Sequence, residues 1–368
     1  GNERYFICLE SEFEDHMPEF EETANVILLD LDSNSSLILA KTHAWNFQQG
    51  SMLYWLPEDN NRKIIFNDTD GKKTFSTIYD IETGEQTRMP RAINAVGKTR
   101  NIALCVSFQR LRRNRKVCSY ACEPGDKRSH PKDDGIFLMD LTTGEQELVV
   151  SLDDVWNANP KTADKELEPD DKDTELWFNH LAFNFDDSKL FFLARYRTKL
   201  GPYRTSMWIT DTDGGNLKCL VDYGKRLSHF EWIANNEILI TMKVKWRIGR
   251  RYVMINTDTQ KTRLLVPRQL KRNGHPTISP QRDLIATDTY AIAGKNRLYI
   301  IDMRRKPRKV HEMASFQSYK PPTSSLRCDP HPRWNRSGTK VCYDGHGKNG
   351  RQVYVVDIKR KQKKIEKN

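Results

Sequence analysis

Short apolar runs that end in Asp or Asn recur along the chain and are typical of β-strands. Seven runs occur, ILLDL, TIYDI, FLMDL, WITDT, VMINT, YIIDM and YVVDI, with the polar members Asp30, Asp80, Asp140, Asp211, Asn256, Asp302 and Asp357. They lie 45 to 71 residues apart, and the shortest spacing matches the length of one four-stranded propeller blade. Helical periodicity is nearly absent, so the pattern predicts an all-β fold.

Most of the runs belong to a predicted hairpin. Five of the seven lead into a turn rich in Gly, Ser, Asn or Thr, such as ETGEQ, and then into a polar or mixed strand. A second hairpin, such as LAFNFDDSKLFFLA, precedes each late copy. Four strands in each of seven repeats predict a seven-bladed β-propeller, which removes long free edges by radial closure. We expect one domain over residues 1–368, with blades near 1–42, 43–91, 92–151, 177–222, 223–267, 268–315 and 325–368.

Two long loop insertions interrupt the repeat. Residues 109–134 are predicted to form a basic loop, and residues 152–176 an acidic one. Loops of this length are usually functional lids or disordered excursions, and both interpretations stay open. The basic tail at 359–368 is expected to be the last strand.

Composition indicates a globular protein with an anionic partner. The chain is 37% hydrophobic and 30% charged, but it contains 8 Trp, 13 Tyr and 15 Phe, too many for a disordered chain. A formal charge of +11 favours an anionic partner, and charge alone does not distinguish nucleic acid, an acidic polysaccharide and a membrane surface. Nucleic-acid binding would rest only on this charge and on RLRRNRK, a run that we interpret either as a guide for an acidic sugar chain or as a solvated surface, so we expect no nucleic-acid partner.

We expect no membrane partner, because no run approaches the roughly 18 apolar residues needed to span a bilayer. No secretion signal is recognisable, and localisation is left open between the periplasm and the cytoplasm of a bacterium. The seven cysteines are scattered and do not form a small disulfide scaffold. The sequence also leaves the oligomeric state open.

Four histidines occupy the same position within their respective repeats. They are His180, His229, His275 and His331, in NHLAF, SHFEW, GHPTI and PHPRW. The innermost strand of each blade lines the axial channel of a propeller, so residues entering that strand should converge on one rim. The alternative is a packing role within each blade, as for the histidine of WD-type repeats.

Residues around two of these histidines have the chemistry of metal ligands. RCDPHPRW places Cys328, Asp329 and His331 within four residues, and Asp288 follows His275 on the neighbouring strand. A thiolate, two imidazoles and a carboxylate suit zinc, while manganese is favoured if the cysteine is not a ligand.

Other polar groups are candidates for contact with a glycan. Four residues of WNFQQGSMLYW combine an aromatic ring with amides, which a carbohydrate face requires; they are Trp45, Asn46, Gln48 and Gln49. The alternative is a satisfied polar loop. Arg195, Arg197 and Arg204 suit a carboxylate because of their bidentate geometry, although surface arginines are common.

SHFEW, GHP with SPQRDLIATDTY, and RCDPHPRW with SGTKVCYD resemble the oligogalacturonate lyase family, and more loosely ulvan lyases and TolB-like propellers. The similarity covers blades 4 to 7 and reaches blade 2 through WNFQQGSMLYW. The resemblance implies a seven-bladed propeller that cleaves uronate oligosaccharides by β-elimination, with a metal held at the channel mouth by histidines and a glutamine.

The resemblance also implies individual roles. His275 would be a metal ligand, and Cys328 and His331 stand where the family has a glutamine and a histidine. His229 would be the base, Arg204 the carboxylate partner and His180 a helper, either a second base or a substrate contact.

One residue departs from the family pattern. Arg333 replaces a further histidine, so either Asp288 or Asp329 completes a different metal site, or the metal is lost and Arg333 neutralises the substrate. A histidine base and a metal or arginine that stabilises the enediolate meet the needs of proton removal next to a uronate carboxylate.

Two other function classes remain open. A glycoside hydrolase would need two carboxylates, for which Asp288, Asp329 and Asp344 are candidates. A propeller without catalytic activity could bind a protein or an acidic glycan. The rim histidines argue against a propeller without catalytic activity, and the replacement of a family histidine by Arg333 argues for it.

Overall fold

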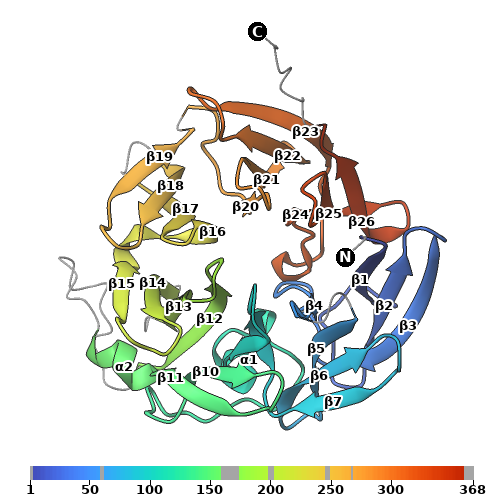
Figure 1. Cartoon of the computed structure of the whole chain (residues 1–368), viewed down its shortest axis with the longest axis vertical. Coiled ribbons are helices and arrows are strands. Elements are labelled where there is room, and N and C mark those ends of the chain that lie inside the picture. The colour runs from blue at the N-terminus through green and yellow to red at the C-terminus, as the bar shows by residue number, and fades with distance from the viewer. Residues whose placement is uncertain are drawn as a thin grey trace. The chain divides into compact units, whose positions relative to one another are not determined.

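The fold consists of seven antiparallel β-sheets in chain order, each built from three or four consecutive strands (Figure 1). The structure is a computed structural model, and it describes residues 3–58, 62–158, 174–197, 203–244, 249–266 and 268–359. The sheets are the blades of a seven-bladed β-propeller, and the fold class predicted from the repeat is confirmed.

The chain divides into two compact units. Unit 1 comprises Gly1–Leu227, Thr257–Gln260 and Pro321–Arg327, and unit 2 comprises Ser228–Asn256, Lys261–Lys320 and Cys328–Asn368. The expected single domain over the whole chain stays a prediction.

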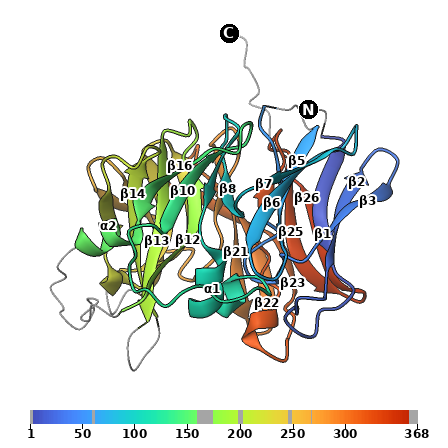
Figure 2. The same ribbon diagram turned by 90° about the horizontal axis from the view of Figure 1, so that it is seen from below.

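Unit 1 contains four sheets. They are β1 (Tyr5–Glu10), β2 (Ala24–Asp30) and β3 (Ser35–Thr42); β4 (Tyr54–Trp55), β5 (Lys63–Thr69), β6 (Thr74–Asp80) and β7 (Gln86–Met89); β8 (Ile93–Val96), β9 (Ile102–Cys105), β10 (Gly135–Asp140) and β11 (Gln146–Ser151); and β12 (Leu176–Phe183), β13 (Lys189–Arg197), β14 (Tyr203–Asp211) and β15 (Lys218–Val221). Figure 2 shows β12, β13 and β14 side by side.

Unit 2 contains three sheets. They are β16 (Ser228–Ala234), β17 (Glu237–Lys243), β18 (Arg250–Asn256) and β19 (Thr262–Leu265); β20 (Thr277–Ile278), β21 (Leu284–Ile292), β22 (Lys295–Asp302) and β23 (Lys309–Gln317); and β24 (Arg333–Trp334), β25 (Lys340–Gly347) and β26 (Gly350–Asp357).

The polar residue at the end of each repeated run has a structural role. In six of the seven sheets it closes the third strand in chain order, for example Asp80 in β6 and Asp140 in β10. Oδ1 of Asp140 accepts the backbone N–H groups of Thr142 at 2.7 Å and Thr143 at 3.0 Å. A carboxylate at this position therefore fixes the turn that leads into the outer strand.

The structure differs from the expected architecture at three places. The first and last sheets each have three strands among the described residues, where four are expected. Residues 109–134 are not a plain loop, because they include most of α1 (Phe108–Asn114) and the 3₁₀ turn η1 (Lys116–Cys118). The insertion at 152–176 begins with α2 (Leu152–Asn157). Residues 159–173, and residues 360–368 of the expected last strand, lie outside the described residues.

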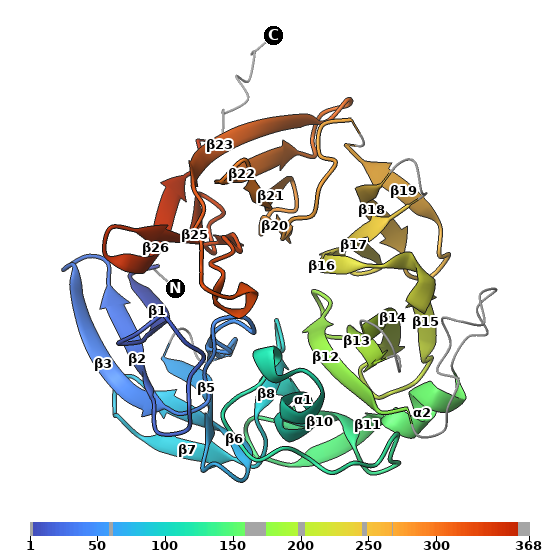
Figure 3. The ribbon, with the colours of Figure 1, turned by 180° about the vertical axis from the view of Figure 1, so that it is seen from behind.

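Helix α1 forms because Ser107 caps its start and because one side is apolar. The side chain of Ser107 accepts the N–H of Arg110, and Phe108 and Leu111 are fully buried. The helix packs against β12 (Figure 3). Arg115 follows directly after the last turn, and its position is therefore tied to that sheet.

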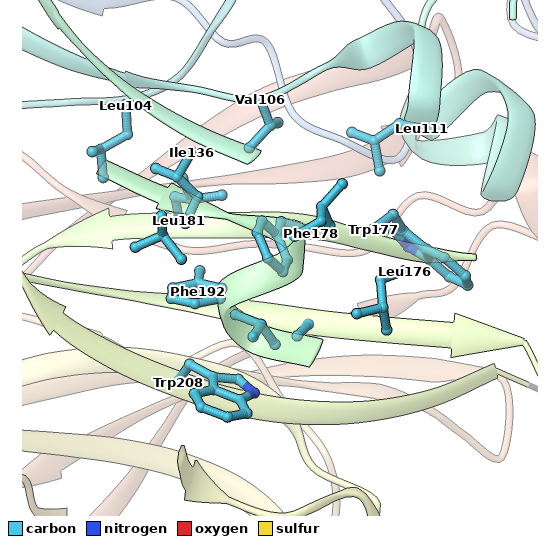
Figure 4. Packing of buried hydrophobic residues seen from close by; sticks show 14 of the residues in the cluster. Leu104, Val106, Leu111, Ile136, Leu176, Trp177, Phe178, Leu181, Phe192 and Trp208 are labelled. Carbon is cyan, nitrogen blue, oxygen red and sulfur yellow. The ribbon is translucent and has the colours of Figure 1, made fainter. Parts of the chain in front are cut away.

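A large apolar cluster of unit 1 lies between the sheet of β8–β11 and the sheet of β12–β15. Figure 4 shows Leu111 of α1, Trp177 and Phe178 of β12 and Trp208 of β14 in this cluster. The indole N–H of Trp208 donates to the hydroxyl of Ser206 at 2.8 Å. Two 3₁₀ turns complete the described helical elements of this unit, η3 (Tyr223–Lys225) and η4 (Ser324–Leu326). No helix among the described residues has the length and hydropathy needed to cross a membrane.

Candidate active site

Three of the four histidines that share one phase come together in unit 2. His229 lies in β16, His275 precedes β20 and His331 precedes β24, so the three successive sheets contribute one imidazole each. The ring centroids of His229 and His275 are 3.8 Å apart, and those of His275 and His331 are also 3.8 Å apart. The expected convergence is found for these three residues. His180 belongs to unit 1.

The backbone at these positions explains the shared phase. His180, His229 and His331 have φ values of 55°, 46° and 41°, in the left-handed region that non-glycine residues rarely adopt. At His180 and at His229 the strand register shifts by a bulge. A bulge re-aims a side chain at the end of pairing, and strained backbone of this kind clusters at functional sites.

A glycine is required immediately before His275. A Cβ atom on Gly274 would overlap the carbonyl oxygen of Asp288 and the hydroxyl of Tyr252. The absence of a side chain lets this segment approach β21 closely, so the backbone N–H of His275 donates to Oδ1 of Asp288 at 2.6 Å. The GH dipeptide therefore serves to place the His275 ring.

Asp288 accepts hydrogen bonds from two of the histidines. Its carboxylate is fully buried, and Oδ2 accepts Nδ1–H of His275 at 2.8 Å and the backbone N–H of His331 at 3.1 Å. Burial raises the pKa of Asp288 above its usual range, while the neighbouring His331 ring and nearby backbone N–H groups, among them those of His275 and His331, oppose that rise. The carboxylate thus fixes the orientation of the His275 ring.

His331 is held in the same manner by a backbone oxygen. Its Nδ1 lies 3.1 Å from the carbonyl oxygen of Asp329, an atom that can only accept a hydrogen bond. Nδ1 therefore carries the proton in His331 as it does in His275, and Nε2 of both rings keeps the lone pair that binds metals. Burial, followed by the neighbouring His275, lowers the pKa of His331 well below its usual value, which favours the neutral ligand form.

The residues present fit a divalent cation. Ligand atoms of His275, Asp329 and His331 all lie within 4.8 Å of one another, and together they offer two imidazoles and one carboxylate. The predicted ligand Asp288 does not belong to this cluster, because its oxygens are bound to Nδ1 and to backbone N–H groups. Cys328 is buried and also lies outside the cluster. Asp329, the alternative carboxylate of the sequence, takes that place.

Two residues beside His229 were not singled out from the sequence. The hydroxyl of Tyr290 lies 3.1 Å from Nε2 of His229, and Nδ2 of Asn273 lies 3.4 Å from the same atom. Tyr290 stands two residues after Asp288 in β21, and this spacing puts both side chains on one face of the strand. That spacing is the signal that could have identified Tyr290.

Arg333 is exposed, and its Nη1 donates to the carbonyl oxygen of Pro332 at 2.9 Å. It pairs with Cys342 across β24 and β25. Its predicted contact with substrate stays a prediction.

The predicted glycan face of unit 1 is corrected by the structure. Trp45 is only 3% exposed, its indole N–H donates to the carbonyl oxygen of Glu22 at 2.8 Å, and its ring packs on Phe13 and Phe47. A buried ring of this kind offers no stacking surface to a sugar.

The neighbouring amide residues are also held by hydrogen bonds or buried. Oδ1 of Asn46 accepts the N–H groups of Gln48 and Gln49, and its Nδ2 donates to the carbonyl oxygen of Ser119. The side chain of Gln48 donates to the carbonyl oxygen of Arg327 at 3.1 Å, and Gln49 is buried. The alternative of a satisfied polar loop accounts for Trp45, Asn46 and Gln48.

The predicted arginines of unit 1 lie in β13 and β14. Arg195 is buried, Arg204 is half-buried, and Arg197 is exposed and donates to the carbonyl oxygen of Asn114. Arg195 and Arg204 occupy opposite faces of the sheet, because Arg195 pairs with Thr205 and Arg204 pairs with Tyr196. His180 lies in β12, half-buried, where the following N–H of Leu181 donates to Oδ1 of Asn94. The roles of these residues stay predictions.

Comparison with solved structures identifies the fold. The chain is similar to an oligogalacturonate lyase in complex with manganese, with a TM-score of 0.64 and 14% identity over 96% of this chain and 97% of that one. It is also similar to an oligogalacturonate lyase from Vibrio parahaemolyticus, with a TM-score of 0.63 and 13% identity over 96% and 91% of the two chains.

A third similar structure is the β-propeller domain of the Trilobed protease from Pyrococcus furiosus, with a TM-score of 0.56 and 11% identity over 96% and 95% of the two chains. No protein-family model and no curated protein matches the chain. The chain therefore has a lyase-like propeller fold, and the same fold occurs in proteins of other activities.

Proposed function

We propose that the protein is a lyase that cleaves uronate-containing acidic glycans by β-elimination, at the site of His229, His275 and His331. The observation that carries this proposal is the arrangement of the three imidazoles. In His275 and His331 Nδ1 is bonded to an oxygen, so that Nε2 carries the lone pair that can bind a cation. The ring centroid of His229 lies 3.8 Å from that of His275, and His229 is outside the group of candidate metal ligands. One site thus offers both a cation-binding group and a separate base.

His275, Asp329 and His331 would hold a divalent cation. Manganese accompanies one similar lyase, and zinc also suits two imidazoles and a carboxylate. When bound, the cation would supply positive charge to the uronate carboxylate as the neighbouring proton leaves. Asp288 would keep Nε2 of His275 directed at the ligand position.

His229 would remove the proton next to the carboxylate. An imidazole suits this step because its ordinary pKa lies close to neutral pH. Because Nδ2 of Asn273 can only donate, Nε2 of His229 carries the lone pair, and this nitrogen would take the proton. We propose that Tyr290 and Asn273, next to Nε2, set the orientation of the ring. We propose that Arg195, Arg204 and Arg333 contact the glycan, and that Arg204 binds its carboxylate as a bidentate partner. His180 would be a helper, either a second base or a substrate contact.

The test is an absorbance assay near 235 nm, where the unsaturated uronate product absorbs. Purified protein is incubated with pectic, ulvan and glycosaminoglycan oligosaccharides, with added manganese or zinc. A rise that His229→Ala abolishes and a chelator suppresses supports the proposal. If oligosaccharides bind but no absorbance develops with any of them, the lyase is excluded and a glycan-binding propeller replaces it.

A further inference from the structure

One face of the last sheet of unit 1 carries polar side chains, and of these the proposed function uses only Arg195, as a contact to the glycan. Trp177 in β12 pairs directly with Arg195 in β13, and Arg195 pairs with Thr205 in β14. Tyr203 stands two residues before Thr205, so its ring lies on the same face. This face therefore places an indole, a guanidinium and a phenol ring next to one another.

Two buried donors on this face have no acceptor in the described part of the chain. Arg195 is 7% exposed, and its Nε and Nη1 lack hydrogen-bond partners there. The indole N–H of Trp177 also lacks a hydrogen-bond partner there, and Trp177 has no exposed surface. Buried polar groups in folded proteins are nearly always hydrogen-bonded, so adjacent donors without acceptors are unusual. Both groups can donate and neither can accept.

A second guanidinium approaches the same aromatic ring. Arg115 lies just after α1, and its guanidinium carbon is 4.2 Å from the ring centroid of Tyr203, while that of Arg195 is 5.1 Å away. Nε of Arg115 donates to Sγ of Cys118 at 3.2 Å. Contact with an aromatic face stabilises a cation in part, but it does not neutralise two like charges.

The electrostatic environment of Arg195 is unfavourable in the absence of an anion, whereas Cys118 and Tyr203 raise the pKa of Arg115 against the effect of its burial. Burial, and next the charge of Arg115, lower the pKa of Arg195 to about 10. Among the residues that the structure describes, no carboxylate forms an ion pair with Arg115 or Arg195. A buried cation is ordinarily paired, because burial without a counter-charge is costly.

We propose that Arg115, Trp177, Arg195 and Tyr203, which all belong to unit 1, form a binding site for an oxyanion group. An oxyanion only accepts hydrogen bonds, and it would satisfy the Trp177 N–H and the Arg195 guanidinium together. Its charge would also offset the repulsion between the two arginines. The ligand class is a carboxylate, sulfate or phosphate group. This proposal does not depend on lyase activity.

The first experiment follows the indole N–H signals of the full-length protein by NMR. Trp177→Phe keeps an aromatic ring and removes the N–H, so the signal that it deletes is that of Trp177. Sodium acetate, sulfate and phosphate are added in separate titrations, with sodium chloride as the control for ionic strength. We expect at least one oxyanion to shift the Trp177 signal in a saturable manner. Acetate alone would indicate a carboxylate ligand, and sulfate or phosphate alone would indicate a tetrahedral anion.

The second experiment compares Arg195→Met with a matched control. Arg88→Met removes an arginine that also stacks on an aromatic ring, Phe75 at 3.6 Å, in the exposed outer strand β7. We expect Arg195→Met to weaken anion binding about 10-fold or more, because a hydrogen bond to a charged group is lost. Arg88→Met should bind the anion as the wild type does.

Thermal unfolding distinguishes the anion site from a purely structural arginine. Without added oxyanion, Arg195→Met should unfold at a higher temperature than the wild type, since an unpaired buried charge is removed. Added oxyanion should stabilise the wild type more than it stabilises Arg195→Met at the same concentration. The proposal is overturned if no oxyanion moves the Trp177 signal, or if the shift saturates at the same anion concentration in Arg195→Met as in the wild type.

Discussion

Asp288 and His275 form a hydrogen-bonded pair in which Oδ2 of the buried carboxylate lies 2.8 Å from Nδ1 of the imidazole. A carboxylate behind a metal-binding histidine orients the ring and increases its basicity. We therefore expect Asp288→Asn to weaken manganese or zinc binding by about 10- to 100-fold. Isothermal titration calorimetry of the metal-free protein measures this change.

Asp344→Asn is a suitable control for that experiment. Asp344 is an aspartate of the same unit that lies outside the group of candidate metal ligands. It should retain wild-type metal affinity. Equal affinities for Asp288→Asn and the wild type would show that Asp288 does not support a metal ligand.

The three histidines should separate into two classes when each is replaced. His275→Ala and His331→Ala are expected to lose stoichiometric metal binding, because each removes one of three clustered ligands. His229→Ala should bind metal normally and lose about 10²- to 10⁴-fold in the rate of elimination, the usual contribution of a general base. Metal content by mass spectrometry and the absorbance assay measure the two properties separately. Loss of metal in His229→Ala would assign that residue to the metal site instead.

The strand pattern could be predicted because the responsible interactions are local. An aspartate at a strand end accepts N–H groups two and three residues later, as Asp140 does, and such a contact leaves a trace in a short sequence window. The shared phase of His229, His275 and His331 is local in the same sense, since each residue enters the first strand of its sheet.

Burial and partner choice could not be predicted from the same windows. Trp45 resembles an exposed aromatic in the sequence, but Glu22 and Phe13, more than twenty residues away, cover it. Asp288 has the chemistry of a metal ligand, and only the close approach of Gly274 directs its oxygens to N–H groups instead. The orientation of a carboxylate depends on tertiary contacts that a pattern does not encode.

Gly274→Ala should destabilise the protein and disrupt the histidine site. A methyl group there would overlap the backbone of β21 at Asp288 and the hydroxyl of Tyr252. Overpacking of this kind typically costs about 1–3 kcal/mol of folding free energy. Urea denaturation measures the loss. Gly215→Ala, where the nearest atom is the side-chain oxygen of Asp213 at 3.1 Å, is the control and should cost less.

The pH dependence of stability should include a contribution from Asp80. Its hydrogen bond with the Arg62 guanidinium lowers the pKa of Asp80 from 3.8 to about 2. A carboxyl group with a lowered folded-state pKa stabilises the protein above its ordinary pKa, and this contribution is lost as the pH falls from about 4 to about 2. Asp80→Asn should therefore be less stable at neutral pH and lose less stability on acidification. Asp357→Asn, at the exposed equivalent position in β26, should keep the wild-type dependence in urea denaturation.

Tyr290→Phe tests whether the hydroxyl next to His229 contributes to the proposed elimination. The change removes a hydrogen bond of 3.1 Å to Nε2 and keeps the ring that packs edge-on against His229 and His275. A single hydrogen bond contributes about 1 kcal/mol, so kcat should fall about five-fold while metal affinity stays constant.

Tyr299→Phe is the matched control for Tyr290→Phe, because it removes a hydroxyl from the adjacent strand β22. It should leave kcat unchanged. An unchanged kcat in Tyr290→Phe would show that the hydroxyl does not position the base, and a loss of metal affinity would show that Tyr290 acts on the ligands rather than on His229. A fall in kcat with intact metal binding would place Tyr290 with His229 in the proton-transfer part of the site.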